Sequence, residues 1–170
     1  MEPLAIFGTQ LILSLLVYSL VAKWYLDPWL ASQPVDKALM PLIFPHAIRH
    51  LGLTFLVTGV VAQPLPSVFA NPVAYGDLVS GFLAIVALVA LRRQWGLALP
   101  LVWIFNIVGT VDLLNALRHA AAVPLLGATW FIPTFWVPLL LVTHAMIFAR
   151  LLRHGSLQPV ASGGGEASSS

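Results

Sequence analysis

The sequence predicts an all-α, polytopic integral membrane protein, a bundle of five transmembrane helices. Of its 170 residues, 59% are hydrophobic and only 8% are charged, and the mean hydropathy is +0.93. A soluble domain carries about 25% charged residues, and a disordered chain combines low hydrophobicity with high charge. The composition therefore excludes both classes. Five apolar stretches also reach the roughly 20 residues that a helix needs to cross a bilayer core about 30 Å thick.

The five predicted helices follow one another with short connections. We expect them at about residues 4–26, 39–62, 73–91, 96–119 and 129–152. Together they make one transmembrane domain, residues 1–155. The remaining segment, residues 156–170, is rich in Gly and Ser, and we expect it to be a disordered cytoplasmic tail.

The connections consist of residues that end helices. In chain order they are Asp27-Pro28 to Gln33-Pro34, Gln63-Pro64-Leu65-Pro66 with Asn71-Pro72, Arg92-Arg93-Gln94, and the segment 120–127 with Pro124. Proline cannot continue a helix interior, and it pushes the residue before it out of the helical region. Three of the four breaks between the predicted helices therefore have a local physical cause.

The basic residues predict the orientation of the bundle. They gather at the first connection, at the third connection and at the end of the fifth helix: Lys23 and Lys37, Arg92 and Arg93, Arg150 and Arg153. Because Lys and Arg concentrate on the cytoplasmic side of a membrane, we expect the N-terminus outside and the C-terminus in the cytoplasm of a bacterial-type inner membrane. The expected partner is the lipid bilayer. The net charge of +2 forms no basic face, so no nucleic acid is expected.

The second predicted helix carries polar residues on one face. In an α-helix, residues three and four apart lie on the same side, so we expect His46, Arg49 and His50 to share a face. Arg49 lies near mid-helix, where inserting an arginine costs about 2.5–3.5 kcal/mol. Each Leu, Ile, Phe and Val of this helix favours insertion into the membrane by about 0.3–0.6 kcal/mol. The insertion cost of Arg49 offsets about half of the free energy that these residues contribute together. This face is therefore expected to point into the bundle.

Polar residues of the other helices lie at related depths. Asp112, Asn115 and His119 form a stripe on the fourth helix. At about 1.5 Å per residue, Asp112 lies about 6 Å outward from mid-helix, within the combined reach of an arginine and an aspartate from Arg49. The remaining polar residues form two groups. In the central group, Asn106 and His144 lie at the depth of His50. In the outer group, Asp77 and Arg118 lie with Asn115 and His119 nearer the outer surface.

This distribution predicts an intramembrane polar cavity that binds or transports a small lipophilic or anionic molecule. Arg49 would hold a carboxylate, carbonyl or phosphate, the imidazoles would donate hydrogen bonds, and Asp112 would orient Arg49. The predicted ligand-binding residues are His46, Arg49, His50, Asp112, Asn115 and His144. The predicted supporting residues are Asn106, Asp77, Arg118 and His119.

Two other functions are compatible with the same residues. A redox protein with non-covalent haem b would take His50 and His144 as axial ligands, since no CxxCH is present. Alternatively, the buried polar groups of a structural or assembly protein only fasten helices, through contacts that contribute about 0.6 kcal/mol each. No metal site is expected, because the chain has no cysteine and Arg49 shares the face of His46 and His50 and repels a divalent ion.

Three runs of the sequence carry a resemblance to other proteins. They are LIFPHAIRHLGL, VWIFNIVGTVDLLNALRH and FIPTFWVPLLLVTHAMIFARLL. These runs resemble those of small uncharacterised bacterial inner-membrane proteins, over most of residues 1–155. The resemblance implies a location in the inner membrane and carries no assigned activity.

Overall fold

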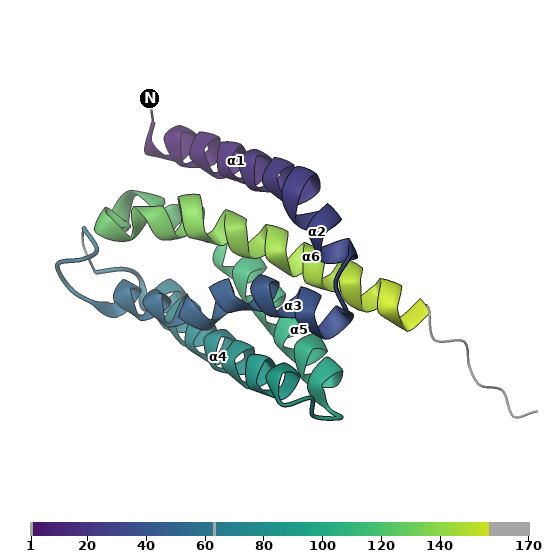
Figure 1. Cartoon of the computed structure of the whole chain (residues 1–170). Coiled ribbons are helices and arrows are strands. Elements are labelled where there is room, and N and C mark those ends of the chain that lie inside the picture. Colours follow the sequence, from purple (N-terminus) through teal and green to yellow (C-terminus); the bar gives the residue numbers. More distant parts are fainter. Residues whose placement is uncertain (1, 63, 157–170) are drawn as a thin grey trace, which may run out of the picture.

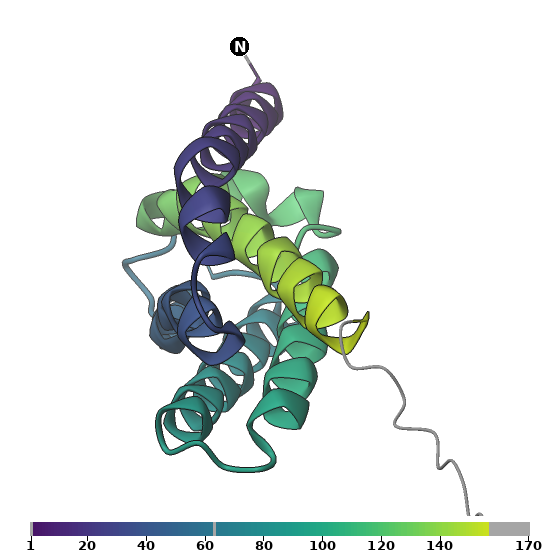
Figure 2. The same cartoon turned by 45° about the vertical axis from the view of Figure 1, so that its right-hand side comes forward.

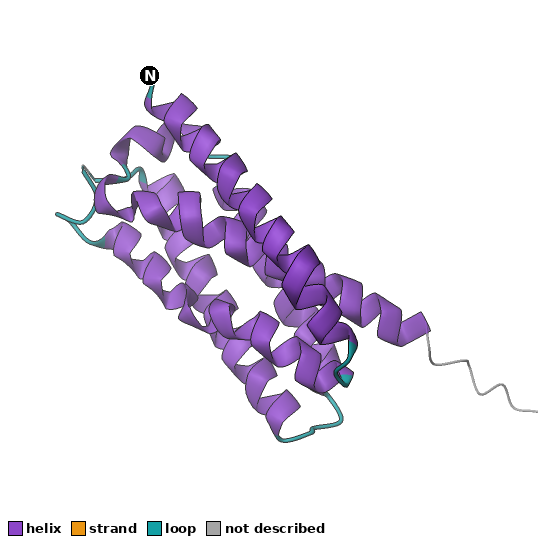
Figure 3. Ribbon diagram, turned by 45° about the horizontal axis from the view of Figure 1, so that its top comes forward, coloured by secondary structure: helices purple, strands orange, loops and turns teal. Residues whose placement is uncertain are grey.

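In the computed structural model, which describes residues 2–62 and 64–156, the chain is built of helices and contains no strand in that part (Figure 3). The prediction of an all-α architecture is confirmed. Five segments are long and apolar enough to cross a membrane: Pro3–Ala31, Val35–Leu56, Ser67–Arg92, Ala98–Ala116 and Gly127–Gly155. Nearly all of the segment predicted as a disordered tail, residues 157–170, lies outside the described residues.

Several spans combine more than one helical element. The first contains α1 (Pro3–Val21), η1 (Ala22–Leu26) and α2 (Asp27–Ala31), and the second contains α3 (Val35–Ile43) and η2 (Phe44–Leu56). The third and fourth are the single helices α4 (Ser67–Arg92) and α5 (Ala98–Ala116). After η3 (Ala120–Leu125), the fifth contains η4 (Gly127–Trp130), η5 (Ile132–Trp136) and α6 (Val137–Ser156).

Two boundaries differ from the expected ones for local reasons. The second span ends at Leu56, because Val57 is extended (φ −94°, ψ 112°) and Gly59 takes a positive φ of 90° that suits a residue without a side chain. The third span begins at Ser67, so Pro72 lies inside α4 instead of before it. In the second turn of a helix a proline removes a single ladder hydrogen bond, and α4 continues through it.

The second span changes helix type half-way. η2 is a 3-10 helix of 13 residues, whereas such helices seldom exceed about four residues. Pro45 lies at its start and has no N–H to donate to the carbonyl of Pro41, so one α-helical hydrogen bond is missing where the helix type changes. A 3-10 helix has about three residues per turn, which places every third side chain on the same face. The buried residues of η2 accordingly are His46, Arg49, Gly52 and Phe55.

The helices pack around α4 and α6. α4 contacts η2 on one side and α5 on the other, and α6 contacts α3 and α5. α1 lies along α6 at the edge of the bundle and has no buried residue (Figure 1 and Figure 2). α1 is therefore attached to a core that the other four spans form together with Leu30 of α2.

Two apolar clusters fill the ends of this core. One, near the connections α2–α3 and α4–α5, includes Leu39, Ile43, Ala87, Val102 and Ile147. The other, near the opposite end, includes Phe55, Phe69, Val73, Ala122 and Leu126. The polar residues of η2, α4 and α5 lie between these clusters along each helix, so the bundle has a polar layer between two apolar ones.

Candidate functional site

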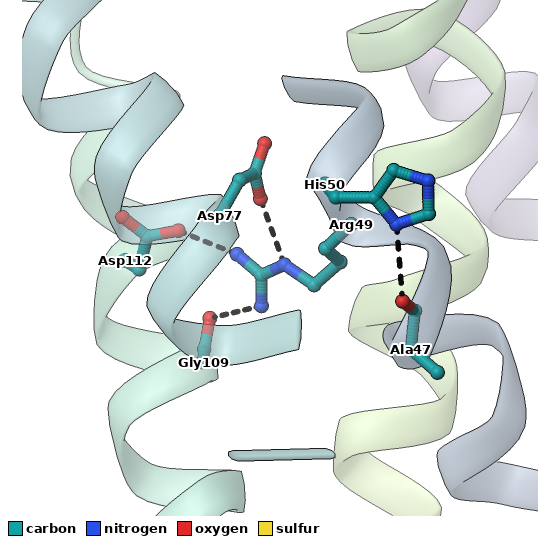
Figure 4. A network of polar contacts seen from close by, with 6 residues as sticks. All are labelled: Ala47, Arg49, His50, Asp77, Gly109 and Asp112. Carbon is teal, nitrogen blue, oxygen red and sulfur yellow. Dashed lines mark hydrogen bonds and ion pairs between the residues drawn. The ribbon is translucent and has the colours of Figure 1, made fainter. Parts of the chain in front are cut away.

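Arg49 is the centre of the polar layer. Arg49 is 1% exposed, and its guanidinium donates hydrogen bonds to two neighbouring helices. Nε donates to Asp77 Oδ1 of α4 over 2.7 Å, Nη2 donates to Asp112 Oδ2 of α5 over 2.5 Å, and Nη1 donates to the carbonyl of Gly109 over 3.1 Å (Figure 4). The expected contact between Arg49 and Asp112 is present. Asp77, expected nearer the outer surface, joins them directly.

Three glycines make room for this cluster. A Cβ at Gly52 would overlap the carboxylate of Asp77, and a Cβ at Gly76 would overlap the carboxylate of Asp112. A Cβ at Gly109 would lie 2.8 Å from Arg49 Nη1 and 2.8 Å from His144 Cε1. Each glycine thus allows a charged or polar side chain to pack directly against a helix backbone.

Two buried imidazoles lie beside the cluster. The rings of His46 and His144 are in contact, with centroids 4.1 Å apart, and Phe105 packs against both. His46 Nε2 lies 2.9 Å from Thr143 Oγ1, whose hydroxyl hydrogen bonds to backbone carbonyls of its own helix, so the imidazole is the donor.

His144 is bound in a similar way by Asn106 of α5. His144 Nδ1 lies 2.6 Å from Asn106 Oδ1, which can only accept, and Asn106 Nδ2 donates to the carbonyl of His144 over 3.2 Å. In the neutral rings the remaining nitrogens, Nδ1 of His46 and Nε2 of His144, are then acceptors. Neither has a hydrogen-bond partner among the described residues.

His50 does not join the other two residues of the expected face. Its side chain is exposed, and its Nδ1 lies 3.3 Å from the carbonyl of Ala47 in the same helix (Figure 4). The cause is the 3-10 geometry of η2: four residues at about 120° each place His50 about 120° around the helix from His46. The expectation of a shared face for His46, Arg49 and His50 therefore holds for the first two residues only.

The outer group is also divided. Asn115 and Arg118 are exposed at the end of α5. His119 is half-buried after the end of that helix, with its ring 5.4 Å from Phe69 and its Nδ1 3.1 Å from the carbonyl of Asn115. The structure thus brings together Arg49, Asp77, Asp112, His46, His144 and Asn106, and leaves His50, Asn115 and Arg118 on the surface.

A cavity lies next to the polar layer, toward the end of the bundle that carries the N-terminus of α1. Its volume is about 200 Å³. Its walls come from α1, η2, α4, α5 and the segment η3–α6, and they are almost entirely apolar: Leu4, Phe7, Phe55, Phe69, Val73, Leu113, Ala116, Leu117, Ala122, Val123, Leu126, Ile132, Pro133 and Val137. The ionisable residues that line it are Asp77, Asp112 and His119.

The two carboxylates connect the cavity with the ion-pair cluster. Each bonds Arg49 through one oxygen, and the other oxygen points away from the guanidinium (Figure 4). Those second oxygens, Oδ2 of Asp77 and Oδ1 of Asp112, have no hydrogen-bond partner in the described part of the chain. Both oxygens lie against helix backbone, at Gly52 and Gly76, and the two aspartates contribute to the lining of a cavity whose other walls are mostly apolar.

The arrangement of the histidines bears on the haem hypothesis. Axial ligands stand on opposite faces of a porphyrin, whereas His46 and His144 touch each other directly. His50, the other expected ligand, is exposed and bonds within its own helix. His50 and His144 are thus not placed as a ligand pair.

Some contributors to this site have only weak sequence signals. The Gly109 carbonyl and the Thr143 hydroxyl are ordinary groups in apolar helices, and nothing in their residue type distinguishes them. The sequence neighbours of Gly76 and Gly109 do not indicate their roles either, because Gly76 makes room for Asp112 and Gly109 for Arg49 and His144, all from other helices.

The fold and the site define a class of protein: an all-helical chain with five membrane-compatible spans around a buried Arg–Asp cluster. The chain belongs to the DUF8737 family, a domain of unknown function, whose family model matches residues 6–152. The matched segment contains the whole cluster and every cavity-lining residue except Leu4. No curated protein and no solved structure matches the chain.

Proposed function

We propose that this chain is a multi-pass membrane protein that binds a small lipophilic molecule in the cavity lined by Asp77 and Asp112. The single observation that carries the proposal is the cavity itself, with apolar walls from five parts of the chain and two aspartates, Asp77 and Asp112, in its lining. Binding sites for small molecules have this character: mostly apolar lining with a few polar groups that orient the ligand. An apolar cavity of about 150 Å³ already binds benzene.

The Arg49 cluster supports this function by holding the carboxylates in place. Arg49 does not line the cavity, and each of its three nitrogens has a partner. A ligand therefore meets the carboxylate oxygens and not the guanidinium. Of the two ligand types that the sequence favours, a lipophilic molecule fits this arrangement better than an anionic one.

The other half of the bundle favours binding over transport. Beyond the polar layer, the core is filled by buried side chains such as Leu39, Ile43, Val102, Phe105 and Ile147. A ligand in the cavity would have to part this packed layer to reach the opposite side of the membrane. We therefore infer a site that is reached from one side.

The membrane and the orientation are part of the same proposal. Six of the eight Lys and Arg residues lie at the end of the bundle away from the cavity, in or next to η1, α3, α4 and α6, whereas Arg49 is buried and Arg118 lies at the cavity end. The positive-inside tendency then places the end with the six basic residues in the cytoplasm of an inner membrane and the cavity in the outer half of the bilayer.

The test is to fill the cavity without changing the rest of the bundle. Val73, which is 4% exposed, lines the cavity, and Val73→Phe would occupy part of it. Ile85, on the same helix, is 47% exposed and outside the cavity, so Ile85→Phe is the matched control. Protein is extracted from membranes in a mild detergent, and organic extracts of the purified samples are compared by mass spectrometry.

The proposal predicts a small apolar compound that co-purifies with the wild type and with Ile85→Phe and is depleted in Val73→Phe. Circular dichroism verifies that both variants keep their helix content. Equal amounts of every extracted compound in the three proteins would contradict the proposal and favour the view that the buried polar groups only fasten the helices.

A further inference from the structure

We propose that the molecule bound in this cavity is an amphiphilic cation, an apolar body that carries one protonated amine, with the ammonium against the second oxygens of Asp77 and Asp112. The inference rests on the proposed binding function and adds the chemical class of the ligand. It follows from three features of the site: its charge, its hydrogen-bond inventory and its walls.

The first feature is an excess of acidic groups. Arg49 supplies one positive charge, whereas Asp77 and Asp112 supply two carboxylates. No Lys or Arg lines the cavity, and the third ionisable residue in its lining is His119. An uncompensated charge in an apolar environment is unfavourable unless a counter-ion or a proton neutralises it. A cation in the cavity would balance the cluster.

The second feature is the pair of free acceptors. Asp77 is 6% exposed, and its Oδ2 has no hydrogen-bond partner in residues 2–62 and 64–156. Asp112 Oδ1 has none in the same residues. Arg49 holds each carboxylate through the opposite oxygen (Figure 4), and the two second oxygens lie beside Gly52 and Gly76, whose missing side chains leave them room. An ammonium group has three N–H donors and no acceptor, which is complementary to two such oxygens.

The third feature is the composition of the walls. Phe7, Phe55 and Phe69 are among the apolar side chains around the cavity, and the rings of Phe55 and Phe69 meet edge to face at 5.9 Å. The enclosed volume of about 200 Å³ has room for an aromatic ring with a short alkyl chain. A body of this kind would fill the apolar space while its amine reached the carboxylates.

A set of three probes with one common body separates charge from hydrophobicity. Phenylbutylamine is a cation at neutral pH, phenylbutanol is its neutral counterpart, and phenylbutyrate is its anionic counterpart. Binding of each is measured by titration calorimetry to the full chain in lipid nanodiscs, and empty nanodiscs supply the correction for partition into lipid. The proposal predicts that the amine binds about tenfold tighter than the alcohol, because one charge-assisted hydrogen bond changes the dissociation constant by about that factor. The acid should bind most weakly of the three.

Variants connect this preference with the site. Asp112→Asn keeps the shape of the side chain and removes one negative charge, so the amine should lose its advantage over the alcohol while the alcohol binds as before. Asp36→Asn, in α3 at the other end of the bundle, is the control and should leave the preference unchanged. Where Asp112→Asn does not fold, Asp77→Asn and the three probes on the wild type still decide the question.

The outcomes separate the two proposals. In one outcome, the alcohol or the acid binds the wild type as tightly as the amine does, and Val73→Phe abolishes this binding. That result would overturn the cationic class of ligand and leave the proposed binding function standing. Wild type that binds none of the three probes above the level of empty nanodiscs would overturn both. An amine preference that survives in Asp112→Asn and Asp77→Asn would also overturn the inference, because the carboxylates would not be its cause.

Discussion

Replacement of Arg49 by methionine tests the polar layer most severely. Methionine replaces the unbranched stem of arginine by an apolar chain, and it removes the guanidinium that donates to Asp77, Asp112 and the Gly109 carbonyl. The two carboxylates would then lie between apolar layers without a cation. The perturbation therefore combines the loss of three hydrogen bonds with the loss of the charge that compensates the two carboxylates.

The size of the effect depends on which of these losses dominates. Three ordinary polar contacts between membrane helices would account for about 2 kcal/mol, at about 0.6 kcal/mol each. Breaking a buried ion pair by removing one partner costs about 3–5 kcal/mol, because a charge is left without compensation. Since Arg49 is 1% exposed and both carboxylates depend on it, we expect the larger figure.

A triple variant shows whether charge is the cause. In Arg49→Met with Asp77→Asn and Asp112→Asn, no buried group is ionised, so the cost should fall to about 2 kcal/mol, the value for the lost hydrogen bonds. The free energy of unfolding is measured by titration with a denaturing detergent in mixed micelles. Arg150→Met is the control: its partly exposed pair with Asp27 should contribute no more than about 1 kcal/mol.

Two results would refute this reasoning. One is an Arg49→Met variant that loses no more stability than Arg150→Met. The other is a triple variant whose loss equals the sum of the single losses, because independent sites add whereas coupled ones do not.

Two further predictions concern packing and the imidazoles. Gly76→Ala should lower the free energy of unfolding by about 1–3 kcal/mol, because its Cβ meets the Asp112 carboxylate, whereas Gly8→Ala, with open space around it, should be neutral or slightly stabilising. His144→Ala should cost about 1–3 kcal/mol because it leaves the buried Oδ1 of Asn106 without its donor, whereas His50→Ala should change stability by no more than about 0.5 kcal/mol.

The same detergent titration measures these four variants. A Gly76→Ala protein as stable as the wild type would show that the α4 backbone does not closely approach Asp112. Equal losses in His144→Ala and His50→Ala would contradict the burial of one ring and the exposure of the other.

The spans could be predicted from sequence because they depend on a property summed over many residues. Roughly 20 apolar residues in a row specify a membrane-crossing helix whatever their order, and the proline-containing connections separate one helix from the next. The cost of burying Arg49 likewise follows from its residue type, and it led to the correct expectation that Arg49 faces the interior and reaches Asp112.

The arrangement of the site depends on details that such sums do not contain. The period of an α-helix groups His50 with His46, whereas Phe44–Leu56 is a 3-10 helix with a period of three. Depth alone puts Asp77 in the outer group, but the close approach of α4 to η2 at Gly52 lets its carboxylate reach Arg49. The cavity requires side chains from five parts of the chain, and no local pattern predicts that they leave space between them.

The central claim is that the cavity next to Asp77 and Asp112 takes up a lipophilic molecule, and photolabelling in membranes tests it most directly. An apolar diazirine probe is added at increasing concentration, and labelled residues are located by peptide mass spectrometry. The account predicts that labelling of Phe69, Val73 and Leu113, which line the cavity, saturates with probe concentration, while labelling of the exposed Val79 and Ile107 rises in proportion to it. Absence of label from the cavity residues, or the same unsaturable increase at all five, would contradict it.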